Sequence, residues 1–183
     1  MDEVDGLPFR LFRAAIVQIA EAKRLSRSRT PGRRSREGDL AAAAIILIQA
    51  SLESWIKSLV GEIPKHTAKK NWLELWRDGP LQEPSDDAKQ MSPLRPPDEA
   101  YQYLKIMNDA RNYFVHGDHQ ARRRVLRHFR DARAFSYSLS SWLPAQWMLE
   151  DANRLFTHAE SVTGLPAPTL DNVRRLNPDL FGG

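Results

Sequence analysis

The strongest constraint on the fold is an apolar helical pattern at residues 38–60. An alanine block is followed by Ile45, Leu52 and other apolar residues at helical spacing, which together fill a wide apolar face. Asp39 is placed to cap the start of this helix, and Gly61 is placed to end it. Its central apolar run is much shorter than the roughly 20 residues of a membrane-crossing helix. We therefore expect the most buried helix of a core, and no membrane association.

Other segments also show the helical period, and none shows a convincing strand pattern. The predicted helices, besides the central one, lie at residues 7–25, 69–76, 97–117, 118–143 and 145–160. The short helix at residues 69–76 is expected to pack on the bundle through Trp72, Leu75 and Trp76. Pro144 is expected to end the long helix that begins at residue 118. The pattern predicts an all-α bundle of four to five main helices.

Two polar segments are expected to interrupt the bundle. Residues 26–37 are rich in arginine, serine, proline and glycine, and predict a flexible basic loop. Residues 77–98 contain five prolines, which exclude a continuous helix and predict a long surface loop. At 183 residues the chain suits one domain. We expect that domain to span residues 1–160, with residues 161–183 as a C-terminal arm.

The composition limits the chemistry. The chain has no cysteine, which excludes disulfides and thiolate metal sites. The acidic residues Asp2, Glu3 and Asp5 stand where an export signal needs positive charge, so we expect a cytoplasmic protein. The net charge of +4 comes mainly from arginine and favours polyanionic partners. No His-Glu-x-x-His run is present, and we expect neither a metal nor a cofactor.

The most informative residues lie at a predicted helix end. Residues 109–118 read Asp-Ala-Arg-Asn-Tyr-Phe-Val-His-Gly-Asp. A continuous helix would turn Arg111 and His116 roughly 140° apart. Gly117 allows the helix to end, so that His116 can swing back toward Arg111. Asn112, four residues before His116, is placed to orient the imidazole. The alternative is that each residue has only a structural role: Arg111 is a cation at the helix end, His116 is a cap and Asn112 forms a turn.

This arrangement resembles the signature of the HEPN superfamily, small helical-bundle proteins that include many ribonuclease toxins and defence nucleases. Arg111 matches the arginine, Asn112 the polar residue, His116 the histidine and Gly117 the small residue that often follows. The helix with Glu53, Trp55 and Lys57 looks like an earlier core helix of the family, so the resemblance covers about residues 38–143. Asp118 stands where the subgroup paired with nucleotidyltransferase antitoxins has a tyrosine, which argues against that pairing.

The resemblance implies a homodimer in which the sites of two protomers meet. It also implies a metal-independent endoribonuclease, acting as a toxin or antiphage effector, with an antitoxin or regulatory protein as partner. His116 suits proton transfer at neutral pH, and Arg111 can clamp phosphate oxygens, so attack by a ribose 2′-hydroxyl would leave a 2′,3′-cyclic phosphate. The alternative is a non-catalytic HEPN module that binds RNA, a nucleotide or a protein.

Further residues are expected to support this site. Glu53 can pair with Arg111 or remain an exposed helix residue, and Asp118 adjoins the motif. Tyr113 can stack on a base, although packing in the core or a dimer is favoured. An RNA backbone can lie along the arginines that follow the motif, which alternatively form a solvated face. These are Arg122, Arg123, Arg124, Arg127 and Arg130.

Overall fold

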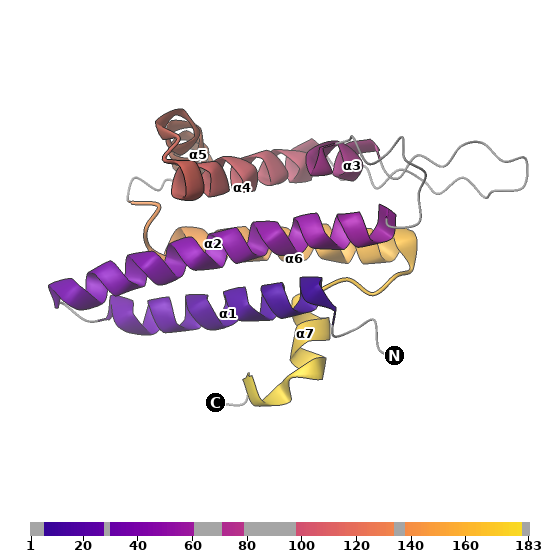
Figure 1. Cartoon of the computed structure of the whole chain (residues 1–183), viewed down its shortest axis with the longest axis horizontal. Helices are drawn as coiled ribbons and strands as arrows, with labels where there is room; N and C mark the ends of the chain where they lie inside the picture. Colours follow the sequence, from indigo (N-terminus) through magenta and orange to yellow (C-terminus); the bar gives the residue numbers. More distant parts are fainter. Residues whose placement is uncertain (1–5, 28–29, 61–70, 79–97, 134–137, 181–183) are drawn as a thin grey trace, which may run out of the picture.

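The computed structural model describes residues 6–27, 30–60, 71–78, 98–133 and 138–180, and every regular element within them is helical (Figure 1). The predicted all-α class is therefore confirmed for this part of the chain. The helices are α1 (Leu7–Ser26), α2 (Pro31–Val60), α3 (Trp72–Asp78), α4 (Asp98–His116), α5 (His119–Arg133), α6 (Trp142–Thr163) and α7 (Leu170–Leu176), followed by a 3₁₀ turn (Pro178–Leu180).

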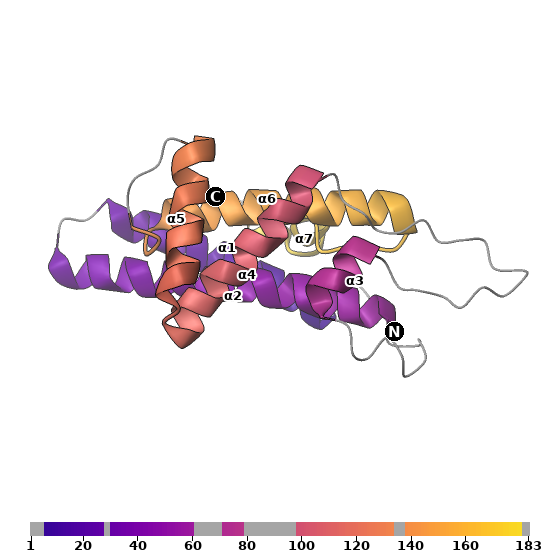
Figure 2. The same ribbon diagram turned by 90° about the horizontal axis from the view of Figure 1, so that it is seen from above.

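The long helices form a layered bundle. Helices α1, α2 and α6 run lengthwise and side by side, and α4 lies over α2 and α6 (Figure 1). Seen from above, α4 crosses α2 and α6 obliquely, and α5 crosses the C-terminal end of α4 at a steep angle (Figure 2). The corner between α4 and α5, where the predicted motif lies, is thus at one end of the upper layer.

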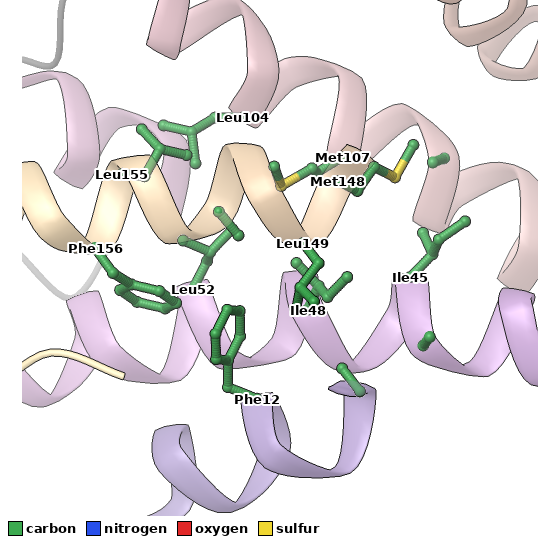
Figure 3. Packing of buried hydrophobic residues seen from close by; sticks show 14 of the residues in the cluster. Phe12, Ile45, Ile48, Leu52, Leu104, Met107, Met148, Leu149, Leu155 and Phe156 are labelled. Carbon is green, nitrogen blue, oxygen red and sulfur yellow. The ribbon is translucent and has the colours of Figure 1, made fainter. Parts of the chain in front are cut away.

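The core lies between these layers and centres on α2. Phe12, Leu52, Leu104 and Phe156 come from four different helices and are fully buried (Figure 3). The Phe12 and Phe156 rings meet edge to face with centroids 5.3 Å apart, a favourable geometry for aromatic pairs. The apolar face predicted for residues 38–60 is buried, but the shorter helix α6 buries as many described residues as α2, so the prediction that the central helix is the most buried one is wrong. Although α2 is long and apolar enough to cross a membrane by length and composition alone, half of that segment is buried inside the bundle.

The start of α2 differs from the prediction of a basic loop at residues 26–37. The helix begins at Pro31, where the missing backbone N–H of proline has no intrahelical partner to lose. The N–H groups of Arg33 and Arg34 donate to the carbonyl oxygen of Thr30. Arginine and glutamate are good helix formers, so exposed charge did not prevent a helix here. Asp39 consequently lies inside α2 and does not cap it.

The predicted continuous helix over residues 118–143 is wrong. Helix α5 ends at Arg133, residues 138–141 are not helical, and α6 begins at Trp142. Pro144 lies in the first turn of α6, where proline is tolerated, and therefore starts one helix instead of ending another. The backbone N–H of Trp142 donates to a carboxylate oxygen of Glu37 at 3.3 Å, and this hydrogen bond joins the start of α6 to α2.

The remaining predictions concern the short helix α3, the proline-rich segment and the C-terminal residues. Trp72, Leu75 and Trp76 of α3 are buried, as predicted, although the helix runs to Asp78. The predicted proline-rich loop lies mostly outside the described residues. In the predicted C-terminal arm, residues 161–163 continue α6, and Val173 of α7 is buried in the core. The Trp55 indole N–H also donates to the carbonyl oxygen of Pro166 at 3.2 Å.

Candidate functional site

A two-residue corner ends α4 and starts α5. Gly117 adopts the left-handed backbone conformation (φ +68°), and its N–H donates to the Tyr113 carbonyl oxygen at 2.9 Å. Asp118 then caps α5, because its side-chain Oδ1 accepts from the backbone N–H groups of Gln120 at 2.9 Å and Ala121 at 3.0 Å. The predicted end of the helix at Gly117 is therefore confirmed.

Arg111 and His116 meet at this corner. Arg111 Nη1 lies 3.2 Å from His116 Nε2 and also 3.2 Å from the Asn112 side-chain oxygen, to which it donates. His116 is still the last helical residue, so the histidine does not swing back; instead the long arginine side chain spans the angle between the two positions. The sequence predicts that Asn112 orients the His116 imidazole, but the side-chain oxygen of Asn112 accepts from the Arg111 guanidinium instead.

A guanidinium has only N–H donors, so a hydrogen bond across this contact requires His116 Nε2 to be the acceptor. The imidazole is exposed, whereas Arg111 and Asn112 are half-buried. Val115, beside His116, is 46% exposed despite being apolar. The site of one chain is therefore open to solvent and to a second macromolecule.

Glu53 on α2 lies within the electrostatic reach of Arg111 without binding it directly. Its carboxylate accepts hydrogen bonds from Gln49 Nε2 at 2.8 Å and from Lys57 Nζ. Partial burial raises the pKa of Glu53, but the bonds from Lys57 and Gln49, with the charges of Lys57 and Arg111, outweigh it and hold the pKa below its ordinary value. The predicted direct pairing with Arg111 is corrected to a charge effect.

The arginines of α5 have different environments. Arg124 donates to both carboxylate oxygens of Asp109 at 2.7 Å, so it is engaged within the chain and not free for RNA as predicted. Arg122 lies over the Tyr113 ring, 5.8 Å from its centroid, and Arg130 pairs with Asp131 at 3.2 Å on the exposed surface.

Two of the predicted RNA-binding arginines remain unengaged. Arg123 and Arg127 are exposed, on the side of α5 opposite the buried stripe of Ala121, Val125 and Phe129. Within the described residues, neither guanidinium has a hydrogen bond or an ion pair. This placement agrees with a solvated helix face and also with a phosphate-binding face. The two interpretations differ in whether Arg123 and Arg127 contact RNA phosphates or only solvent.

Tyr113 packs against the core, which is the role that the sequence favoured for it. The ring is half-buried and packs against the core, with the Phe114 ring centroid 5.0 Å and the His119 ring centroid 6.4 Å away. It also lines an open pocket toward α2. Asp109 was missed by the sequence analysis, because its partner Arg124 is 15 residues away and no local pattern connects them.

Among the residues that the structure describes, no three His, Asp or Glu side chains are grouped so that they could hold a metal ion. Comparisons with protein-family models, with curated proteins and with solved structures found no match to this chain.

Proposed function

We propose that this protein is a metal-independent endoribonuclease of the HEPN type. The observation that carries the proposal is the 3.2 Å contact between Arg111 Nη1 and His116 Nε2 at a solvent-exposed helix end. A proton acceptor and a permanent cation at this separation can both contact a single phosphodiester and its neighbouring ribose. RNA cleavage by transesterification needs these two groups at the reacting phosphate.

In the proposed reaction His116 Nε2 takes the proton of the ribose 2′-hydroxyl. The 2′-oxygen then forms a bond to phosphorus, the bond from phosphorus to the 5′-oxygen breaks, and a protonated group supplies a proton to that leaving oxygen. Arg111 donates to the phosphorane oxygens while they carry the most negative charge. The products are a 2′,3′-cyclic phosphate and a 5′-hydroxyl.

The resting contact has a consequence for this reaction. Arg111 occupies the lone pair on His116 Nε2, which is the atom that must accept the proton. A phosphate is a stronger acceptor for a guanidinium than a neutral imidazole, because the hydrogen bond is charge-assisted at both partners. Substrate binding would therefore draw Arg111 to the phosphate and release Nε2 toward the 2′-hydroxyl.

We also propose that the active form is a homodimer. The motif of one chain contains a single histidine, His116, whereas the reaction needs both an acceptor and a donor of protons. The site is on the surface, and Val115 beside His116 is 46% exposed, so a second copy can cover this apolar side chain and contribute its own histidine. Sedimentation at several protein concentrations tests this, and a strictly monomeric active enzyme would contradict it.

The direct test is digestion of single-stranded RNA with a chelator present. The wild type should cut, whereas His116→Ala and Arg111→Ala should lose cleavage while keeping the helical circular-dichroism signal. Arg111→Lys should remain strongly impaired, because an ammonium cannot bind two phosphate oxygens as a fork. Arg175→Ala, an exposed arginine on α7, is the matched control and should keep full activity. Cleavage persisting in both alanine variants of the motif would refute the proposal.

A non-catalytic HEPN module is the second candidate. The contact between Arg111 and His116 favours it, because each of these two groups already has the other as a partner. The exposed guanidinium groups of Arg123 and Arg127 are then the groups available to bind an anion. Such a protein would bind RNA, a nucleotide or a protein partner without forming cyclic phosphate ends. For the ribonuclease, we propose a cytoplasmic toxin or antiphage effector under the control of an antitoxin or another regulatory protein.

A further inference from the structure

An open pocket of about 530 Å³ lies beside the catalytic corner, between α2 and α4. One face of the N-terminal part of α2 supplies Arg34 and Asp39, and the C-terminal end of α4 supplies Tyr113 and Phe114. Figure 1 shows this end of α4 lying over the N-terminal half of α2. Gly117, the residue directly after His116, also lines the pocket, so its contents would lie next to the proposed cleavage site.

The third wall is held in place by two features of α2. Ser140 lines the pocket, and a Cβ atom built on Gly38 would lie only 3.3 Å from the Ser140 Cβ. Glycine is unfavourable inside a helix, but here it permits the close approach of residues 138–141. The hydrogen bond from the backbone N–H of Trp142 to the Glu37 carboxylate also ties the end of this segment to α2. The pocket is thus defined by packing between three segments.

The lining combines an aromatic surface with charges of both signs. The Tyr113 and Phe114 rings have centroids 5.0 Å apart, and the Arg122 guanidinium lies over Tyr113. The Asp39 carboxylate can only accept hydrogen bonds, whereas Arg34 can only donate them. Within the described residues neither of these two side chains has a hydrogen bond or an ion pair, so both are available to a ligand.

We propose that this pocket binds a guanine nucleotide unit of single-stranded RNA, next to the phosphate that is cleaved. The base stacks on Tyr113, and the two adjacent donors of its Watson–Crick edge, N1–H and the N2 amino group, match the two oxygens of Asp39. Arg34 then contacts the flanking phosphate. An isolated phosphate ion is a poorer occupant, because the Asp39 carboxylate repels it and it has no apolar surface to stack on the aromatic rings.

This inference rests on the proposed function for its position along the RNA, but its test does not need cleavage. The probes are 2′-O-methyl RNA decamers, which cannot form a cyclic phosphate: one of uridine alone, and one with a single central guanine. Fluorescence anisotropy gives the affinity of the full-length protein for each. The guanine decamer should bind about fivefold or more tightly to the wild type, the range expected for one stacked and recognised base.

Two variants assign the residues. Tyr113→Leu keeps apolar volume and should weaken binding of the guanine decamer about fivefold or more, whereas Tyr101→Leu, at a half-buried tyrosine near the other end of α4, should not. Asp39→Asn, at an exposed position, should abolish the preference for guanine. Equal affinity of the wild type for both decamers, or Tyr113→Leu binding as tightly as Tyr101→Leu, overturns the pocket assignment.

The outcome is separable from that of the nuclease proposal. If unmodified RNA is not cut by the wild type but the guanine preference is present and lost in Asp39→Asn, the pocket stands and the nuclease activity falls. If RNA is cut while Tyr113→Leu and Asp39→Asn bind and cut as the wild type does, the nuclease stands and the pocket falls. Thermal unfolding of each variant identifies any loss caused by misfolding.

Discussion

Arg124 of α5 donates two hydrogen bonds of 2.7 Å to the carboxylate of Asp109 on α4, two residues before Arg111. The carboxylate is only 15% exposed, although the guanidinium is about half exposed. The same guanidinium lies 4.0 Å from Asp118, the cap of α5. This pair therefore connects the two helices on either side of the corner that carries the motif, and it fixes the angle at which α5 leaves α4.

Replacing Asp109 with asparagine should loosen this corner. The variant loses a fork that is partly shielded from solvent, and we expect a cost of about 1 kcal/mol. For a chain of this size the midpoint of thermal unfolding should fall by about 2–4 °C. Arg130→Gln removes an ion pair whose two side chains are mostly exposed, and should leave the midpoint unchanged. Equal midpoints for Asp109→Asn and the wild type would show that the fork does not support the corner.

Gly117→Ala should lower both stability and activity. The position has a φ of +68°, and a Cβ atom added there would have no heavy atom within 4 Å, so the cost is backbone strain of about 1–2 kcal/mol and not a clash. Gly164→Ala is a close control, since that residue has the same φ and the same open space at the end of α6. Both variants should lose similar stability in thermal unfolding, but only Gly117→Ala should lose RNA cleavage. Equal loss of activity in both would remove any special role of the corner.

Asp118 should make the stability of the corner depend on pH. The backbone hydrogen bond from Ala121 is the largest cause that lowers its pKa; slight burial opposes it, and the bond from Gln120 with the charges of Arg124 and His119 adds to it. Because the folded-state pKa is depressed, the ionised carboxylate stabilises the protein above the ordinary carboxyl pKa of about 4. That contribution is lost as the pH falls through the lower folded-state value.

The comparison with Asp118→Asn isolates this effect, because asparagine keeps a capping oxygen without the charge. Thermal unfolding midpoints should be higher for the wild type than for the variant at pH 7. The difference should shrink as the pH falls below about 4. A gap that stays constant across this range would mean that the negative charge of Asp118 contributes nothing to the cap.

Arg123 and Arg127 should account for part of the salt dependence of RNA binding. For single strands each phosphate contact adds about 0.7 to the slope of log affinity against log salt, so the double glutamine variant should reduce that slope by about 1.4. Binding is measured by titration at several salt concentrations. The double variant Arg10→Gln and Arg175→Gln makes the same change in net charge on α1 and α7, away from α5, and should leave the slope unchanged (Figure 1). Identical slopes for the two double variants would leave α5 as a solvated face.

Part of the fold was predictable because its signal is local. Apolar spacing identified the buried face of α2, and the prediction that Trp72, Leu75 and Trp76 are buried is confirmed. The errors occurred where a local signal has two meanings. Pro144 can end one helix or start the next, and only the packing of the following residues decided for the start of α6. Arginines are frequent in loops and also stabilise exposed helices, so Arg33 and Arg34 were assigned to a loop.

Helical period and glycine conformation depend on neighbouring residues, so the helical class, the end of α4 at Gly117 and the meeting of Arg111 with His116 were predictable from the sequence. The partners of the charged side chains could not be chosen from the sequence. Arg124 is held by Asp109, Glu53 is bound by Gln49 and Lys57, and the pocket joins Tyr113 to residues of α2. The Arg124 pair and the pocket join positions on different helices, so they depend on how the helices pack. The Glu53 contacts are i,i+4 pairs within α2, a spacing that the sequence already contains.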